Sequence, residues 1–319
     1  RRCRFPPCRR LFPVSQKRSR DPRMRALGPS QRPYGRMMLA ALQILILAAG
    51  IYLLVVGLVF LGQRRLMYHP GGVAGAPADA GLPDADAVRV STADGFELQS
   101  WYLAPRSGRP VLLYLHGNAG TIADRAFKAR LFARQGIGVM LAEYRGYGGK
   151  SGSPTEAGLY ADARANLAWL ANQGHGPGDI IVYGESLGTG VAVQAALEQA
   201  QAGTPVRALV LEAPFTTMSD AAGVHYPWLP TGLLTRDHYA SSAKIGAVQC
   251  PVLVVHGSAD RVVPQDQGKR LFALAAEPKT AAWLSGAGHG DVYDFGAGEI
   301  ILDFLDARPS GDGGVPSVR

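Results

Sequence analysis

Short apolar runs alternate with longer segments of helical periodicity along most of the chain. A representative helical segment is 155–171, with Pro154 just before its expected start. Strands that alternate with helices are typical of a parallel sheet covered by helices on both faces. The pattern therefore predicts an α/β fold with a mostly parallel sheet. The apolar runs expected to form its strands are 110–115, 136–142, 179–183, 207–212, 251–255 and 280–284.

Two stretches depart from this rhythm. Residues 88–92 and 97–103 alternate apolar and polar side chains around Asp94 and Gly95. That pattern predicts an antiparallel hairpin at the start of the sheet. Residues 214–248 contain aromatic side chains and prolines but no clear strand. We therefore expect them to form an insertion between two strands.

One apolar stretch near the N-terminus is long enough to cross a bilayer. Residues 37–62 contain Gln43 as their only strongly polar side chain. The stretch exceeds the roughly 20 residues that a membrane-spanning helix needs. A cleaved signal peptide is the alternative, but its apolar core is only about 7–15 residues long. The stretch is therefore predicted to be a single transmembrane anchor, with 63–86, rich in Gly, Ala and Pro, as a linker.

The net charge of +8 comes from the N-terminal tail, because residues 1–36 hold twelve Arg or Lys and one Asp. The rest of the chain is mildly acidic, which argues against nucleic-acid binding. The tail 1–36 and the C-terminal residues 308–319 are predicted to be disordered, and Met24 is an expected start site. The basic flank before the span outweighs Arg64 and Arg65 after it, so we expect a cytoplasmic N-terminus and an α/β domain on the other side of the membrane.

Cysteines and metal-binding patterns add little. Cys3 and Cys8 lie in the tail, and Cys250 stands alone before an expected strand, where we expect it to be buried like a small apolar side chain. No cluster of His, Cys or carboxylate residues has the spacing of metal ligands. We therefore expect neither a disulfide framework nor a metal, and no cofactor is implied.

Ser186 lies in the most informative motif, the sequence Gly-Glu-Ser-Leu-Gly at 184–188. An apolar run, 179–183, precedes the motif, and a helical pattern, 189–200, follows it. A strand, a sharp turn carrying serine and then a helix form the context in which Gly-x-Ser-x-Gly exposes a nucleophile. An ordinary glycine-rich turn is the alternative. We predict that Ser186 is a catalytic nucleophile.

A serine nucleophile needs a base, and that base needs a carboxylate to orient it. A strand, sharp turn and helix that present a serine in this way form a nucleophile elbow. In proteins with such an elbow, the catalytic residues follow one another along the chain in the order serine, acid, histidine. Asp260 directly follows an expected strand, and His289 lies in a glycine-rich loop after the last one. We predict Asp260 as the acid and His289 as the base. Asp237 and Asp266 are the alternative acids, and both are expected to be solvated. Of the other histidines, His116 and His256 each precede a glycine at a strand end, where a structural hydrogen bond is expected. The rest lie in Gly/Pro-rich segments (His69 and His175) or within 214–248 (His225 and His238).

An oxyanion hole requires two backbone N–H donors aimed at the developing negative charge. One is expected from Leu187, at the start of the helix that follows the serine. The second is expected from Asn118 or Ala119, in the glycine-rich segment after the strand 110–115. An ordinary glycine turn is again the alternative for that segment.

Together these motifs resemble the α/β-hydrolase superfamily of serine hydrolases. More narrowly, the chain is similar to the membrane-anchored abhydrolase-domain branch, which includes lysophospholipases and protein depalmitoylases. The resemblance covers about 86–306. The matching segments are His-Gly-Asn-Ala-Gly at 116–120, Tyr-Arg-Gly-Tyr-Gly at 144–148, Ser-Gly-Ser-Pro at 151–154, Gly-Glu-Ser-Leu-Gly at 184–188, Tyr-Pro-Trp-Leu-Pro at 226–230 and Val-Val-Pro at 262–264.

The resemblance implies an α/β-hydrolase fold at 87–307 with a small cap at about 214–248. It also implies hydrolysis of carboxylic esters or thioesters through an acyl-enzyme, with a small or lipid-like acyl substrate and a membrane as partners. Two alternatives stay open: a serine aminopeptidase that uses the same triad, and a non-catalytic binding protein tethered to a membrane. The large cap side chains either line an acyl pocket or pack the cap onto the core: Phe215, Met218, Tyr226, Trp228, Leu229, Leu233 and Leu234.

Overall fold

The computed structural model describes residues 32–307, and describes side chains from residue 34 onward. The predicted tail at 308–319 and most of the predicted tail at 1–36 lie outside these residues. The described residues divide into two units, one that ends at Val55 and one that begins at Val56. The second unit carries the sheet and every predicted site residue.

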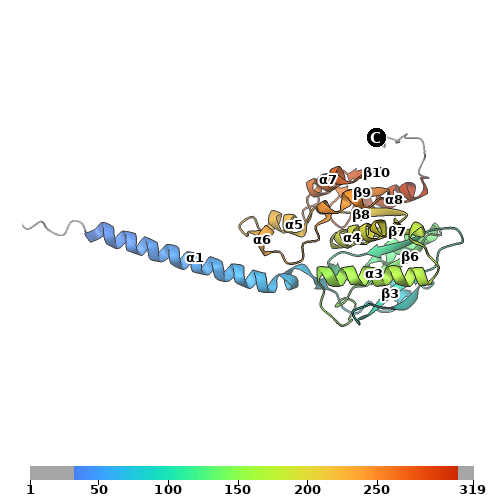
Figure 1. Ribbon diagram of the computed structural model, residues 1–319, viewed down its shortest axis with the longest axis horizontal. Helices are drawn as coiled ribbons and strands as arrows, with labels where there is room; N and C mark the ends of the chain where they lie inside the picture. The colour runs from blue at the N-terminus through green and yellow to red at the C-terminus, as the bar shows by residue number, and fades with distance from the viewer. Residues whose placement is uncertain (1–31, 308–319) are drawn as a thin grey trace, which may run out of the picture. The chain divides into compact units, whose positions relative to one another are not determined.

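An eight-stranded sheet forms the centre of the second unit, with the order β10-β9-β8-β7-β4-β6-β3-β2 (Figure 1). The first hairpin, β2–β3, is antiparallel, and β3 also pairs antiparallel with β6. All other neighbours are parallel. The mostly parallel sheet predicted from the apolar runs is therefore confirmed. Its strands are β2 Asp86–Ser91, β3 Glu97–Leu103, β4 Val111–Leu115, β6 Gly138–Ala142, β7 Ile180–Glu185, β8 Ala208–Glu212, β9 Val252–Gly257 and β10 Lys279–Leu284.

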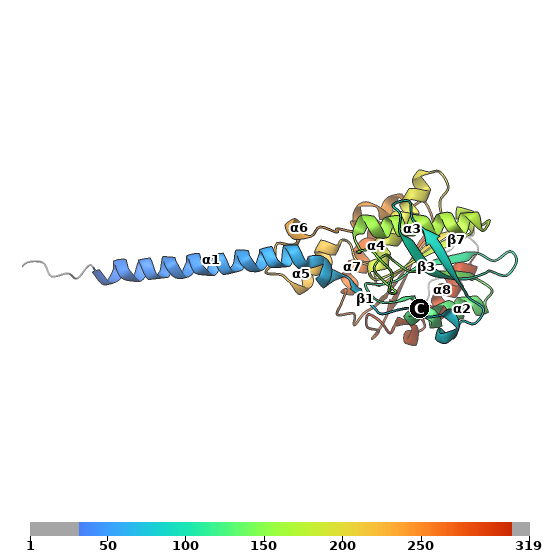
Figure 2. The ribbon, with the colours of Figure 1, turned by 90° about the horizontal axis from the view of Figure 1, so that it is seen from below.

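Helices cover both faces of the sheet, as Figure 2 shows for α3 on one side and α2 and α8 on the other. Alternate side chains of each strand enter different cores. Leu113 and Val182 pack with α3, α4 and α7, whereas Leu112 and Tyr183 pack with α2 and α8. Burial on both faces explains why these strands are almost continuously apolar. The helices are α2 Ala126–Arg134, α3 Glu156–Asn172, α4 Leu187–Gln201, α7 Gln265–Leu274 and α8 Ala297–Asp306.

The segment predicted as a cap connects β8 to β9. It contains two short helices, α5 Met218–His225 and α6 Thr231–Leu234. The Thr217 side chain caps α5 by accepting a hydrogen bond from the backbone N–H of Asp220. Short 3₁₀ helices complete this and other connections, at Pro77–Ala80, Ile122–Arg125, Pro177–Asp179, Ser241–Ala243, Ile245–Ala247 and Val292–Phe295.

The predicted anchor lies in helix α1, Arg32–Met67, which is long and apolar enough at Tyr34–Met67 to be a candidate membrane span. The stretch predicted as a linker, 63–86, is partly built into the domain. It begins inside α1 and contains the strand β1, His69–Pro70. This strand pairs in parallel with β5, Ala119–Gly120. Tyr68 and Leu82 are also buried.

A buried cluster of charges lies next to the strand that carries the elbow. The Lys128 ammonium donates hydrogen bonds to Glu185 at 3.0 Å and to both oxygens of Glu212 at 2.9 Å. Arg125 also pairs with Glu185, at 2.7 Å. Burial favours neutral Glu185, but the charges of Lys128 and Arg125 prevail and hold its pKa well below the usual range. Removing one of these cations would leave a carboxylate buried without its partner.

Replacing Lys128 with methionine is therefore expected to lower the free energy of unfolding by about 3–5 kcal/mol, because Glu212 would lose its cation. Urea unfolding of the detergent-solubilised full-length protein measures the change. Arg164→Met is the matched control. The Arg164 side chain, which pairs with Glu198, is 51% exposed, so this ion pair should contribute about 1 kcal/mol or less. Equal losses in the two variants would contradict the assignment of a stabilising role to the buried cluster.

Candidate active site

The turn at Ser186 connects the end of β7 directly to the start of α4. Ser186 has a φ of 50°, in the left-handed region that non-glycine residues rarely adopt. The helix passes so close that a Cβ at Gly188 would lie 2.0 Å from the carbonyl oxygen of Leu115. A Cβ at Gly184 would lie 2.6 Å from the Gly188 oxygen. Both glycines are thus required for the sharp turn that presents Ser186.

The structure brings together the three side chains predicted as a triad. Ser186 Oγ lies 3.0 Å from His289 Nε2, and His289 Nδ1 lies 2.7 Å from Asp260 Oδ2. The carboxylate is buried, whereas the imidazole is 24% exposed. A carboxylate bound to Nδ1 favours the tautomer whose Nε2 can accept a proton from serine. The arrangement is therefore suited to nucleophilic acyl transfer.

Asp260 is fixed by partners on both of its oxygens. Oδ1 accepts hydrogen bonds from the backbone N–H groups of Val262 and Val263, each at 2.8 Å. His256 Nε2 lies 3.3 Å from Oδ2 and 2.8 Å from the Val263 carbonyl oxygen. Burial raises the pKa of Asp260, but hydrogen bonds from His256 and His289 outweigh it and hold the pKa well below the usual range. The carboxylate thus stays ionised beside His289.

The alternative acids lie elsewhere. The Asp266 side chain is 76% exposed in α7, as expected. Asp237 was expected to be solvated, and that expectation is wrong: its side chain is 4% exposed and accepts two hydrogen bonds from Arg64, at 2.8 and 2.9 Å. The sequence placed Asp237 in a polar connection without showing which cation would reach it. The structure supplies Arg64, 173 residues earlier in the chain.

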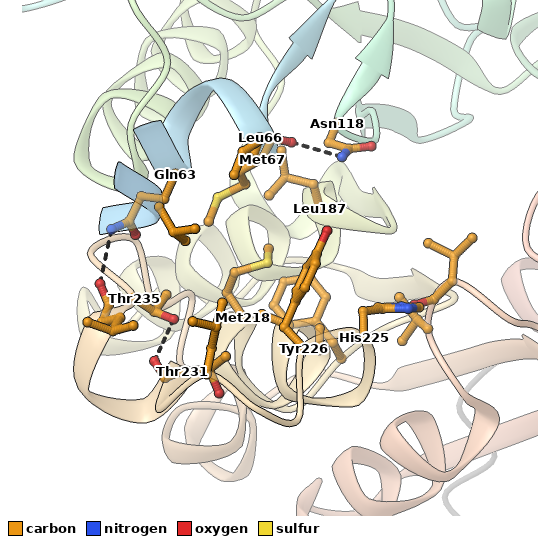
Figure 3. Close-up of a pocket in the computed structure, with 18 of the residues that line it drawn as sticks. Gln63, Leu66, Met67, Asn118, Leu187, Met218, His225, Tyr226, Thr231 and Thr235 are labelled. Carbon is orange, nitrogen blue, oxygen red and sulfur yellow. Dashed lines mark hydrogen bonds between the residues drawn. The ribbon is translucent and has the colours of Figure 1, made fainter. Parts of the chain in front are cut away.

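The candidate oxyanion donors lie beside Ser186. Leu187 is the first residue of α4, where a backbone N–H has no acceptor within the helix. Asn118 follows β4 and Ala119 begins β5, and the preceding Gly117 lies against this turn, where a Cβ on it would be 3.5 Å from the Ser186 Cβ. Asn118, Ser186 and Leu187 line one cavity, and Figure 3 shows Asn118 and Leu187 on the same side of it. Among the hydrogen bonds of the described residues, none uses the backbone N–H of Asn118.

An apolar cavity of about 230 Å³ opens at Ser186. Five of the seven cap side chains considered for a pocket line it: Phe215, Met218, Tyr226, Leu229 and Leu234. Trp228 and Leu233 do not line it, and they are 52% and 86% exposed. His225 also lines the cavity and bonds through Nε2 to the Val262 carbonyl oxygen at 2.7 Å. This bond connects the cap to the loop that carries Asp260.

Sequence analysis missed one wall of the cavity. Val59, Gln63, Leu66 and Met67, from the end of α1, line it together with the cap. These positions share one face of a helix, at spacings of three and four residues. Because almost every residue before them is apolar, periodicity could not distinguish a pocket-lining face from a lipid-facing one.

The described residues give no sign of a metal centre, since no group of three or more His, Cys, Asp or Glu side chains could hold an ion. Cys250 is buried, and this burial raises the pKa of its thiol to about 12. A thiol with so high a pKa is a poor nucleophile at neutral pH. Ser186 is therefore the candidate nucleophile that the geometry favours.

Comparison with known proteins agrees with this geometry. A family model described as "alpha/beta hydrolase fold" matches residues 110–235. An uncharacterized protein of Mycobacterium tuberculosis is 43% identical over 246 residues, which cover 76% of this chain and 85% of that protein. The lysophosphatidylserine lipase ABHD12 of Danio rerio is 33% identical over 257 residues, which cover 70% of this chain and 66% of the lipase.

A solved structure supports the same fold. The esterase Pf2001 of Pyrococcus furiosus matches with a TM-score of 0.58 and 17% identity, covering 74% of this chain and 98% of the esterase. At that identity the likeness concerns the fold alone. The chain therefore belongs to the α/β-hydrolase family, as the order of its strands, its family-model match and its relatives show.

Proposed function

We propose that this protein is a membrane-anchored serine hydrolase that cleaves carboxylic esters or thioesters of lipid-like acyl groups. The observation that carries the proposal is the chain of contacts from Ser186 through His289 to Asp260, together with the apolar cavity that Ser186 lines. The lipase relative supports an ester-hydrolysing activity.

The reaction follows from the positions of these groups. Ser186 Oγ attacks the acyl carbon, and its proton passes to His289 Nε2. The N–H groups of Leu187 and of Asn118 or Ala119 stabilise the negative oxygen of the tetrahedral intermediate. The bond to the leaving oxygen or sulfur then breaks, and His289 delivers the proton to that atom. Water attacks the acyl-serine by the same route, releasing the carboxylic acid and restoring Ser186.

The cavity favours a long apolar acyl group. Most of its lining is aliphatic, aromatic or thioether, and a chain held there would be removed from water. The related Danio rerio protein is named as a lysophosphatidylserine lipase, which supports a lipid substrate here. A serine aminopeptidase is less well supported, because none of the described residues lining the cavity is acidic. A substrate ammonium would have no carboxylate partner among them.

A series of p-nitrophenyl esters of increasing acyl length tests the activity directly. With the full-length protein in detergent, kcat/KM is expected to rise as the chain lengthens and fills the cavity. An amino-acid p-nitroanilide serves as the aminopeptidase probe, and little hydrolysis is expected. Cleavage of the anilide in preference to every ester would contradict the proposed substrate class.

The proposed topology places the N-terminus in the cytoplasm and the hydrolase domain across the membrane, because the basic flank precedes the span. In a bacterial host, a C-terminal alkaline phosphatase fusion is therefore expected to be active, and a C-terminal green fluorescent protein fusion to be dark. The opposite pattern would place Ser186 in the cytoplasm. A mature protein that lacks residues 37–62 would show that the stretch is a signal peptide.

A further inference from the structure

The last turns of α1 belong to the same compact unit as the hydrolase domain, Val56–Arg319. Residues 34–54 of the helix are all exposed, whereas partly buried positions recur further along at Val59, Gln63 and Met67. Positions four and eight residues apart share one face of a helix. One face of the end of α1 is therefore packed against the domain, in addition to joining it to the apolar stretch.

This face forms part of the candidate acyl site. Val59, Leu66 and Met67 line the cavity that opens at Ser186. Figure 3 shows Leu66 and Met67 on the side of the cavity opposite Met218 of the cap. Val59 lies within the apolar stretch 37–62, so the predicted membrane span and the cavity wall overlap in sequence. The three apolar side chains on this face would contact an acyl chain held in the cavity.

Polar contacts fix the end of α1 against the cap. Gln63 donates through Nε2 to the Leu234 carbonyl oxygen at 3.0 Å, and its Oε1 accepts from the Arg236 N–H at 2.8 Å. Arg64 donates two hydrogen bonds to the buried carboxylate of Asp237. Two-point contacts at neighbouring residues set both the rotation and the register of the helix. The cavity wall is thus held in one position.

The same segment holds the loop with the candidate oxyanion donors. The carbonyl oxygen of Met67, the last residue of α1, accepts a hydrogen bond from Asn118 Nδ2 at 2.9 Å. The Asn118 carbonyl oxygen accepts from the His69 N–H and from the Tyr147 hydroxyl, each at 2.9 Å. Directly beyond, β1 pairs with β5. The orientation of the Asn118 peptide group therefore depends on where α1 ends.

We propose that the end of the anchor helix, residues 59–67, forms part of the active site. Val59, Leu66 and Met67 bind the acyl chain and determine which chain lengths fit. The hydrogen bond between Met67 and Asn118 positions the oxyanion loop, so that Asn118 is a positioning residue through its side chain. This inference rests on the proposed esterase activity and adds to it the part of the chain that recognises the acyl group.

Narrowing the cavity at its α1 wall tests the binding role. Val59→Trp in the full-length protein is expected to lower kcat/KM for p-nitrophenyl palmitate by about tenfold or more relative to p-nitrophenyl butyrate. Leu61→Trp is the matched control, because Leu61 lies two residues further along the same helix, is 76% exposed and does not line the cavity. Its ratio of the two substrates is expected to match that of the wild type.

The outcomes separate this inference from the proposed function. Suppose that the wild type is active. If the ratio of kcat/KM for the two esters then changes equally in Val59→Trp and Leu61→Trp, or in neither variant, the binding role alone is overturned. A folded wild type that hydrolyses none of the esters would instead contradict the proposed activity, and the inference with it. Unfolding curves for all three proteins show whether each is folded.

The positioning role is tested by Asn118→Ala, which removes the bond to Met67 but keeps the backbone N–H. Titration with a fluorophosphonate counts competent active sites, so kcat can be expressed per site. We expect kcat per site to fall by about tenfold or more with KM changed by about twofold or less, because a small displacement of an oxyanion donor is costly.

Asn166→Ala is the control for a purely structural asparagine, since Asn166 is buried in α3 and bonds to Ser100 and to the Asp162 carbonyl oxygen. It is expected to lower stability but not kcat per titrated site. If Asn118→Ala behaves in the same way, with an unchanged kcat per site, its side chain only stabilises the fold and the positioning role is overturned.

Discussion

Replacing Ser186 with alanine is expected to lower ester hydrolysis by about 10⁴-fold or more while the protein still folds. Ser186 Oγ is the atom that would form the acyl-enzyme, and it lies 3.0 Å from its candidate base, His289 Nε2. Alanine is smaller than serine and leaves the neighbouring backbone donors in place. The measurement is kcat/KM for a long-chain p-nitrophenyl ester with the full-length protein, alongside an unfolding curve.

Ser153→Ala provides the matched control, because Ser153 is exposed and does not line the cavity. That variant is expected to keep the wild-type rate. Substantial turnover by a folded Ser186→Ala protein would mean that another group forms the covalent intermediate, or that none does. Either result would remove Ser186 from the proposed mechanism.

Changing Asp260 to asparagine is expected to lower kcat by about 10³–10⁴-fold with the fold retained. The backbone N–H groups of Val262 and Val263 both point at Oδ1, so the asparagine carbonyl oxygen would occupy that position. Its NH₂ group would then face His289 Nδ1 and donate to it. The imidazole would be forced into the tautomer with hydrogen on Nε2, which cannot accept a proton from Ser186.

Asp266→Asn is the control for this change, since Asp266 was the alternative acid and its side chain is 76% exposed. It is expected to have almost no effect on kcat. A loss of less than about tenfold in Asp260→Asn, or an equal loss in Asp266→Asn, would mean that a different carboxylate orients the base.

The sequence predicted the sheet because burial on both faces leaves a simple pattern. Strands such as β4 and β7 are short, apolar and separated by helices, so their number and direction follow from periodicity. The candidate site could also be predicted from the sequence, because its residues lie at or after strand ends. Ser186, Asp260 and His289 each follow a strand of a parallel sheet, and the ends of parallel strands meet at one edge.

Contacts between segments that are far apart in the sequence could not be predicted from periodicity. Asp237 is buried because Arg64 reaches it, and nothing near Asp237 in the sequence indicates that partner. Polar residues such as Gln63 and Arg64 are expected at the end of any membrane-spanning stretch. Their presence therefore did not indicate hydrogen bonds to the cap. Trp228 and Leu233 were considered for the cavity on hydropathy alone, although the turns of the cap direct them away from it. Periodicity describes a single element and cannot specify the element that packs against it.

Fluorophosphonate labelling of the full-length protein tests the central claim most directly, because the reagent reacts with serine only where the hydroxyl is activated by a base. The account predicts one covalent adduct, located on Ser186 by peptide mass spectrometry, slowed by a long-chain ester and absent from the Ser186→Ala protein. An unlabelled Ser186 in a folded wild-type protein, or an adduct on a different serine that persists in Ser186→Ala, would contradict it.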